Sequence, residues 1–296
     1  MLEKRQRRRA LLTALVCAPW SLACAKSARA ADNDASTTRQ LASLEQDSGV
    51  RLGLAALDTG DGRRFEHRAN ERFPMCSTFK MLAGAAVLAR SVKEPGLLAR
   101  RMVIRRQDLL EYAPITSHHV GSEMTVQQLC AAAISYSDNT AGNLLLEVLG
   151  GPAALTAYVR TLSDPVTRLD RTEPELDTAI PGDPRDTTTP AAMLGNMRKL
   201  LLTDALPAKA RSLLQTWLMN NTTGKQRIRA GVPANWRVGD KTGSGRNGVV
   251  ADVAIIWPPD RAPILLTIYA GPSTDGRDSP RTLIASAAKI IASAYA

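Results

Sequence analysis

The tetrapeptide Ser77-Thr78-Phe79-Lys80 places a hydroxyl and an amine within one helical turn, at the start of the apolar run over residues 81–88. Residues three apart on a helix share a face, so the two side chains can touch. A serine hydroxyl is a weak nucleophile until a neighbouring base takes its proton. At an ordinary lysine pKa of about 10.4, only about one amine in 2,500 is neutral at pH 7, so Lys80 needs burial or nearby cations to act as that base. Alone, such a pair more often marks a solvated helix face than catalysis.

Two further polar triplets follow at wide intervals. Ser137-Asp138-Asn139 comes after a helical run, and Lys241-Thr242-Gly243 is predicted to open a strand that continues through Ser244 and Gly245. Singly, the first triplet is an ordinary helix cap and the second an ordinary turn. In this order, after Ser-x-x-Lys, the three motifs resemble those of class A serine β-lactamases and penicillin-binding proteins.

The resemblance to class A serine β-lactamases extends over essentially the whole chain beyond residue 30. Residues 168–177 and 182–190 resemble the Ω-shaped loop beside the active site of that family, here taken as residues 168–186. The resemblance implies that Glu173 in this loop activates a water molecule. It also implies that Arg171 and Asp186 close the loop as an ion pair.

The same resemblance implies a role for each side chain of the site. The catalytic positions of the family match Ser77, Lys80, Ser137 and Glu173. The substrate-binding positions match Tyr112, Asn139, Asp177, Arg227, Lys241, Thr242 and Ser244. Ser77 is then the nucleophile, and either Lys80, or Glu173 acting through a water, takes its proton. Backbone N–H groups of Ser77 and Ser244 stabilise the oxyanion.

The remaining roles concern the leaving group and the substrate. Ser137 passes a proton to the departing lactam nitrogen, and Asn139 holds the side-chain amide of the substrate. Tyr112 forms an aromatic wall of the pocket. Arg227 joins Lys241, Thr242 and Ser244 in a donor-rich pocket for the substrate carboxylate.

Asp177 departs from the family pattern, because most members have an asparagine there that helps to hold the hydrolytic water. The change replaces an amide by a group that only accepts hydrogen bonds when ionised, and it adds a second carboxylate near Glu173. Like charges raise one of the two pKa values. We expect either slower turnover or a carboxyl pair that shares a proton.

The predicted function is hydrolysis of penicillins and cephalosporins through a serine acyl-enzyme, which confers β-lactam resistance. A D-alanyl-D-alanine peptidase shares the three motifs, but Glu173 supplies the water-activating base that a peptidase trapped by penicillin lacks. A non-catalytic penicillin sensor would need a membrane anchor. No cofactor is expected, and the three histidines show no metal-ligand spacing, which argues against a zinc hydrolase.

Cys76 and Cys130 are the two cysteines that follow the first 30 residues. An exported pair often forms a disulfide, and buried thiols are the common alternative. The resemblance implies two unpaired thiols, because the family's partner positions are Gly245 for Cys76 and Gly84 for Cys130. The bridge to position 245 occurs in relatives noted for hydrolysing carbapenems, so efficient carbapenem hydrolysis is not expected.

These residues need elements to position them. A helix is predicted over residues 34–47, a half-buried strand over 51–58 and a returning strand over 64–67. Residues 77–214 are predicted to be mostly helical, followed by strands over 249–257 and 264–269 and a helix over 281–295. This order predicts a mixed α/β fold: an antiparallel sheet flanked by helices and built from both chain termini. The predicted sheet domain comprises residues 31–68 and 221–296, and an all-helical domain of residues 69–220 is inserted into it.

The net charge of +10 is concentrated at the N-terminus. Residues 1–30 hold seven cations and one anion, so only four net positive charges remain elsewhere, which disfavours nucleic acid as a partner. A basic start, an apolar stretch over 10–25 and the small-residue site Ala28-Arg29-Ala30 predict an export signal cleaved after Ala30. Arg8-Arg9 is compatible with twin-arginine or general export. We expect a periplasmic monomer that binds small β-lactams and, once cleaved, no membrane.

Overall fold

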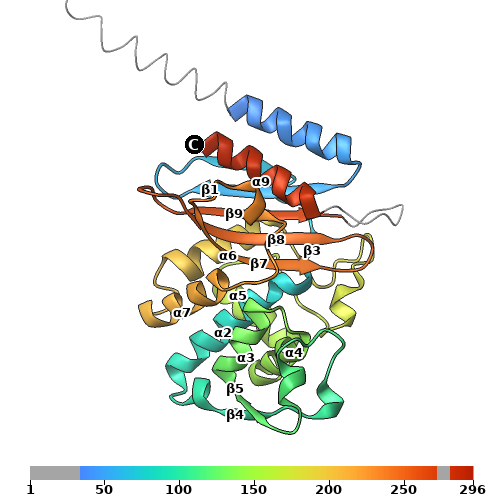
Figure 1. The fold of residues 1–296 in the computed structure, drawn as a ribbon, viewed down its shortest axis with the longest axis vertical. Coiled ribbons are helices and arrows are strands. Elements are labelled where there is room, and N and C mark those ends of the chain that lie inside the picture. The colour runs from blue at the N-terminus through green and yellow to red at the C-terminus, as the bar shows by residue number, and fades with distance from the viewer. Residues whose placement is uncertain (1–33, 272–280, 296) are drawn as a thin grey trace, which may run out of the picture.

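The computed structural model describes residues 34–271 and 281–295, so the predicted export signal lies outside the described residues. A five-stranded antiparallel sheet has the order β2-β1-β9-β8-β7. Its strands are β1 (Leu52–Asp58), β2 (Arg64–His67), β7 (Arg237–Ser244), β8 (Val250–Trp257) and β9 (Ile264–Ala270). The prediction of one sheet built from both ends of the chain is confirmed (Figure 1).

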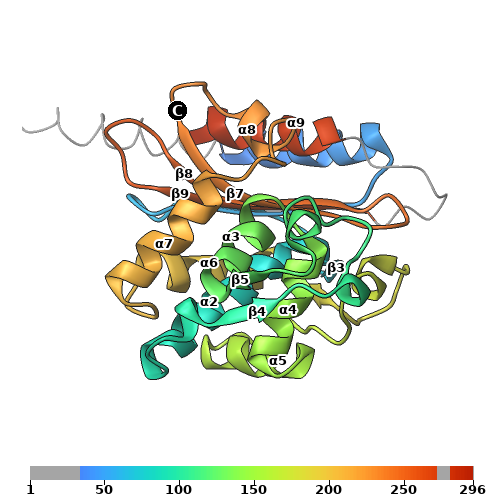
Figure 2. The same ribbon diagram turned by 60° about the horizontal axis from the view of Figure 1, so that its bottom comes forward.

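Helices cover both faces of this sheet (Figure 2). One face packs against the helix over residues 34–48 and against α9 (Arg281–Tyr295). The opposite face packs against α6 (Pro190–Leu202) and the helices below it. The strand over 51–58 is therefore not half-buried as its alternation predicts, because all seven residues of β1 are buried.

The segment between β2 and β7 is mainly helical. Its other helices are α2 (Phe79–Lys93), α3 (Val126–Ser135), α4 (Asn139–Leu149), α5 (Pro152–Thr161), α7 (Ala208–Met219) and α8 (Ile228–Gly231). Short 3-10 turns are η1 (Cys76–Thr78), η2 (Leu97–Ala99), η3 (Arg106–Asp108), η4 (Thr116–His119) and η5 (Glu175–Thr178). Among the described residues, no helix is both long and apolar enough to cross a bilayer.

Two short ladders correct the prediction that residues 69–220 are all-helical. β3 (Phe73–Pro74) pairs with β6 (Thr187–Thr188), and β4 (Arg101–Val103) pairs with β5 (Glu123–Thr125). Strands of two or three residues leave no periodicity to read in the sequence. The β3–β6 ladder fastens the end of the Ω loop beside the start of α2, so it helps to position the site.

The larger core cluster joins helices α2, α3 and α4 to residues of the sheet, such as Val253 and Leu265. Apolar burial of this kind supplies the main stabilising free energy of a fold. The packing fixes α2 between the sheet and the other helices. The division into two domains, with boundaries at 68/69 and 220/221, stays a prediction.

Candidate active site

Ser77 lies in η1, which runs directly into α2, and it is 7% exposed. The preceding Cys76 has a φ of 44°, a backbone conformation that L-residues other than Asn and Asp seldom adopt. Such strain persists only where the surrounding structure enforces it, and it is frequent at functional sites. Lys80 follows in the first turn of α2, with its Nζ 2.7 Å from the Ser77 Oγ. The predicted contact between the two side chains is confirmed.

The Lys80 ammonium is fully buried and surrounded by oxygen atoms. Besides Ser77, it contacts the Ser137 carbonyl at 2.9 Å, Asn139 Oδ1 at 2.5 Å and Glu173 Oε1 at 2.9 Å. An ammonium group has three protons to donate, so these four acceptors use its full capacity. Lys80 Nζ thus contacts residues of the Ser-x-x-Lys motif, the Ser-Asp-Asn triplet and the Ω loop at the same time.

Ser137 lies in the connection between α3 and α4, with a φ of 60°. Its Oγ accepts a hydrogen bond from Lys241 Nζ at 2.9 Å. The neighbouring Asp138 caps α4 through the Ala141 N–H at 2.8 Å, so the middle residue of the triplet is structural. Lys241 is fully buried, and burial, followed by the charges of Lys80 and Arg227, holds its pKa well below the usual range.

The Lys-Thr-Gly triplet closes β7 and does not open it, because the strand begins at Arg237 and ends at Ser244. Residues 237–240 hold a single β-branched residue, Val238, beside a glycine and an aspartate, so no run of strand-forming residues extended the prediction backwards. A Cβ on Gly243 would lie 2.8 Å from the Met75 carbonyl oxygen and 3.3 Å from Cys76 Cβ. Glycine therefore lets the end of β7 approach the turn that carries Ser77.

Glu173 reaches the site from the Ω loop and is 2% exposed. Its Oε1 lies 2.9 Å from Lys80 Nζ and 3.4 Å from Ser77 Oγ, while Oε2 has no hydrogen-bond partner among the described residues. Asn143 on α4 fixes the backbone of this residue, since its side chain accepts from Glu173 N and donates to Glu173 O, each at 2.9 Å. Asn143 was missed from sequence, although it follows Asn139 by one helical turn.

Asp177 lies close enough to Glu173 for the two carboxyl groups to interact. Burial, reinforced by the charge of Glu173, raises the pKa of Asp177 to about 8. Its Oδ1 is buried and has no hydrogen-bond partner in the described part of the chain. A protonated Asp177 has an O–H to donate, so the geometry fits a carboxyl pair that shares one proton.

Arg227 is 3% exposed and donates to protein acceptors. Its Nη1 donates to the Gly243 and Ala251 carbonyls at 2.6 and 2.5 Å, and Nη2 donates to Ser244 Oγ at 2.7 Å. Burial lowers its pKa, whereas the charge of Asp252 acts in the opposite sense. Arg227 thus orients Ser244 at the end of β7.

Eight of the eleven predicted residues line one cleft of about 670 Å³, and the buried Lys80, Glu173 and Lys241 are not among the lining residues. Its lining includes Ser77, Tyr112, Ser137, Asn139, Asp177, Arg227, Thr242 and Ser244. Tyr112 lies at the rim, with half of its surface exposed. Arg281, the first residue of α9, also lines the cleft, and no motif in the sequence indicated it. Lys225 of the same lining was missed as well.

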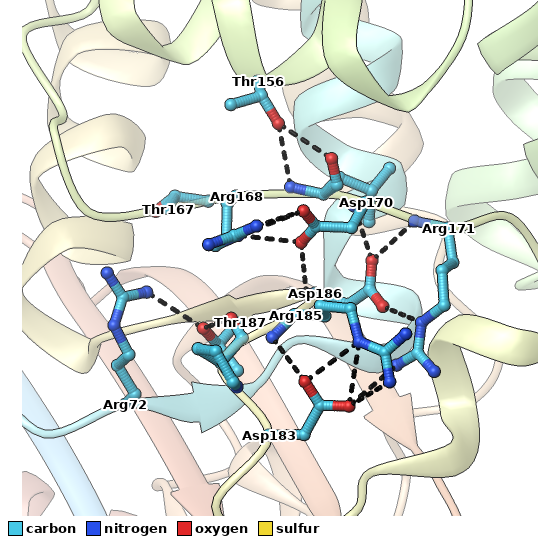
Figure 3. A network of polar contacts seen from close by, with 12 residues as sticks. Arg72, Thr156, Thr167, Arg168, Asp170, Arg171, Asp183, Arg185, Asp186 and Thr187 are labelled. Carbon is cyan, nitrogen blue, oxygen red and sulfur yellow. Dashed lines mark hydrogen bonds and ion pairs between the residues drawn. The ribbon is translucent and has the colours of Figure 1, made fainter.

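The Ω loop is held by ion pairs at its neck (Figure 3). Arg171 Nε lies 2.6 Å from Asp186 Oδ2, so the predicted pair is present. Asp186 Oδ1 also accepts the backbone N–H groups of Asp170 and Arg171 at 2.7 and 2.9 Å. Because Asp186 is fully buried, these donors compensate the cost of burying its charge.

Both cysteines of the described residues are free and buried, which confirms the expected unpaired thiols. Burial, with the charges of Asp177 and Glu173, raises the pKa of the Cys76 thiol. A Cβ on Gly245 would lie 2.6 Å from Cys76 Sγ, so this glycine leaves room for the thiol. No group of three potential metal-ligating side chains occurs within residues 34–271 and 281–295.

Comparison with known proteins finds a matching family and relatives that are similar over almost the whole chain. The profile of the β-lactamase enzyme family matches residues 36–295. The chain is 49% identical to β-lactamase CTX-M-25 of Escherichia coli over 97% of its own length and 98% of the relative. It is 48% identical to β-lactamase Toho-1 of Escherichia coli, over 96% and 97% of the two chains.

Solved structures give the same result. The class A β-lactamase of the last common ancestor of Gram-negative bacteria is similar with a TM-score of 0.85 and 57% identity, over 88% of this chain and 99% of that one. A β-lactamase from Desulfarculus baarsii is similar with a TM-score of 0.86 and 53% identity, over 88% of this chain and 97% of that one.

Proposed function

Because the chain belongs to the class A β-lactamase family, we propose that Ser77 opens the β-lactam ring and that Glu173 directs the water that releases the product. The enzyme hydrolyses β-lactams of the penicillin and cephalosporin types and so confers resistance to them. The observation that carries the proposal is the position of Glu173, whose Oε1 lies within 3.4 Å of the nucleophile and 2.9 Å of Lys80.

In the acylation half, Ser77 Oγ forms a bond to the lactam carbonyl carbon and loses its proton. Lys80 Nζ donates to three oxygens and forms an ion pair with Glu173, so it must first give up a proton before it can act as the base. Glu173 is the acceptor within reach, either from Lys80 at 2.9 Å or from Ser77 through a water. Both routes leave the proton on Glu173.

The ring C–N bond then breaks, and the nitrogen takes a proton from Ser137. Lys241 at 2.9 Å replenishes that proton. The oxyanion is stabilised by the backbone N–H groups of Ser77 and Ser244, which Gly243 allows to approach. Removal of one such donor typically costs about 100- to 1,000-fold in rate.

Substrate binding uses donors that the protein leaves available. Asn139 Oδ1 is held by Lys80, so its amide N–H₂ is free to donate to the side-chain amide of the substrate. The substrate carboxylate binds to Lys241, Thr242 and Ser244, with Arg227 acting mainly through its bond to Ser244. Tyr112 covers the rim, and Asp177 borders the hydrolytic water.

Before deacylation, the proton on Glu173 returns through Lys80 and Ser137 to Lys241, so Glu173 is again a carboxylate. Water then attacks the ester carbon and gives a proton to Glu173, the bond between the carbon and Ser77 Oγ breaks, and Oγ takes that proton from Glu173 through Lys80. Glu173→Gln tests this step. In this variant Lys80 is no longer paired with a carboxylate and remains as the base for Ser77, so we expect penicillin to acylate the variant and to remain attached, which intact-protein mass spectrometry detects. The matched control is Glu175→Gln, an exposed residue of the same loop, which keeps full turnover. Release of penicillin by Glu173→Gln at the normal rate would contradict the proposal.

We also propose that the protein is exported to the periplasm as a monomer, on the strength of the sequence over residues 1–30. N-terminal sequencing of the protein from a periplasmic extract should begin at Ala31. Light scattering of that protein should give the mass of one chain. A first residue within the apolar stretch, or a dimer mass, would contradict the respective statement.

A further inference from the structure

A second hollow, of about 310 Å³, lies where α5 meets the first residues of the Ω loop. In the part of the chain that the structure describes, it shares no lining residue with the catalytic cleft. Three arginines from separate segments border it: Arg72 before β3, Arg160 in the last turn of α5, and Arg168 in the Ω loop. Among the described residues, Asp170 is the single acidic residue of its lining. The bordering side chains therefore carry two more positive than negative charges.

Backbone carbonyls hold two of the three guanidinium groups. Nη1 of Arg72 donates to the Val166 carbonyl at 3.0 Å. Nη1 of Arg160 donates to the carbonyls of Asp164 and Thr167 at 2.6 and 2.7 Å. Within the described residues, Nε and Nη2 of both arginines have no hydrogen-bond partner. Because one nitrogen is anchored, the free donors are preorganised and lose little freedom when they bind a ligand.

The guanidinium group of Arg168 donates hydrogen bonds from two of its three nitrogens. Arg168 donates from Nε and Nη2 to Asp170, at 2.9 and 2.5 Å, and its Nη1 has no partner in the part of the chain described. Asp170 also accepts the Asp186 N–H at 3.0 Å, so its carboxylate already has donors. Figure 3 shows Arg72 and Arg168 on the same side of this network, away from Arg171.

The other carboxylate near the hollow is satisfied inside the protein. Asp164 is buried, and it accepts the N–H groups of Val166 and Thr167 at 2.7 and 2.9 Å. Its second oxygen accepts from Asn196 at 2.6 Å. Within the described residues, Asp164 therefore forms no ion pair with the arginines that border the hollow.

We propose that this hollow binds a small tetrahedral oxyanion, of which inorganic phosphate is the simplest. Guanidinium groups donate to phosphate oxygens in charge-assisted hydrogen bonds, the stronger class of such bonds. A divalent anion matches the excess of two positive charges. Bound there, it bridges α5, the start of β3 and the neck of the loop that carries Glu173. The site is independent of the catalytic cleft.

Isothermal titration of the full chain with inorganic phosphate tests the proposal, with chloride adjusted to keep the ionic strength constant. We expect one saturable site, and a thermal unfolding midpoint that rises with phosphate concentration. Arg160→Gln should weaken binding at least tenfold. The matched control is Arg39→Gln, which removes an exposed arginine on the helix over residues 34–48 and should leave binding unchanged.

A variant that should bind phosphate more tightly distinguishes loss of the site from damage to the fold. Asp170→Asn removes the competing carboxylate and frees the fork of Arg168, so we expect phosphate to bind more tightly by severalfold. The proposal is overturned if phosphate gives no saturable heat, if Arg39→Gln weakens binding as much as Arg160→Gln, or if Asp170→Asn weakens it. Circular dichroism confirms that each variant is folded.

Discussion

Asp177 offers the sharpest test of the hydrolytic step, because its carboxyl group changes its ionisation within the pH range in which the enzyme can be assayed. Burial and the charge of Glu173 raise the pKa of its carboxyl to about 8. At pH 7 a group with this pKa is protonated in roughly ten molecules of eleven, and at pH 9 in about one of eleven. The protonated form can donate a hydrogen bond to Glu173 or to the hydrolytic water, and the ionised form cannot.

We therefore expect kcat to fall about tenfold between pH 7 and pH 9, if only the protonated form supports deacylation. Asp177→Asn carries a neutral amide that donates at every pH, so it should lose this decline and keep a kcat within about threefold of the unmodified enzyme at pH 7. The assay is steady-state hydrolysis of a penicillin at saturation, with deacylation measured separately in single turnovers.

Comparing the pH profiles of Asp177→Asn and the unmodified enzyme also excludes another cause of the alkaline decline in kcat. Lys241 has a lowered pKa, so its deprotonation can reduce the rate at alkaline pH in both enzymes. A decline of kcat at alkaline pH is caused by Asp177 only if Asp177→Asn abolishes it. Glu175→Gln serves as the neutral control in the same loop. Parallel pH profiles for Asp177→Asn and the unmodified enzyme would refute the shared-proton reasoning.

Three further outcomes are expected. Asp186→Asn breaks a buried ion pair at the loop neck and should lower the free energy of unfolding by about 3 kcal/mol in urea titrations; a loss below about 1 kcal/mol would contradict this. Gly243→Ala places a methyl 2.8 Å from the Met75 carbonyl, so kcat should drop at least about tenfold with the fold retained, and unchanged kinetics would count against a tight approach of β7. Penicillin binding to Ser77→Gly should be accompanied by proton uptake at alkaline pH, because the substrate carboxylate raises the lowered pKa of Lys241; calorimetry in two buffers of different ionisation enthalpy, repeated over a range of alkaline pH, would show no difference at any pH if the substrate leaves that pKa unchanged.

Local sequence patterns predicted most elements of the fold, because helix and strand periodicity reflect burial directly. The strand over 51–58 shows the limit of that approach. Its alternation indicates one buried face. The structure buries both faces, because the helix over residues 34–48 and α9 cover one face of the sheet and α6 covers the other. Such coverage depends on contacts between distant segments, which a local pattern does not contain.

Site residues with a motif were found, and those without one were missed. Ser77, Lys80, Ser137 and Glu173 belong to motifs with fixed spacing and meet as expected. Arg281 enters the cleft from the last helix, and its position depends on how α9 packs on the sheet. No spacing to another site residue could have identified it.

The two buried lysines of the site are stabilised by different means, and the difference explains what the substrate contributes. Lys80 has the Glu173 carboxylate at 2.9 Å and three further acceptors. Lys241 has only the Ser137 hydroxyl and the Thr242 carbonyl within hydrogen-bond distance among described residues, and no carboxylate in ion-pair contact. Burial and the charges of Lys80 and Arg227 lower the pKa of Lys241, and no carboxylate of the described residues lies in ion-pair contact to offset them. A bound substrate carboxylate supplies the missing negative charge, so Lys241 becomes a proton donor to Ser137 when a β-lactam with that carboxylate occupies the cleft.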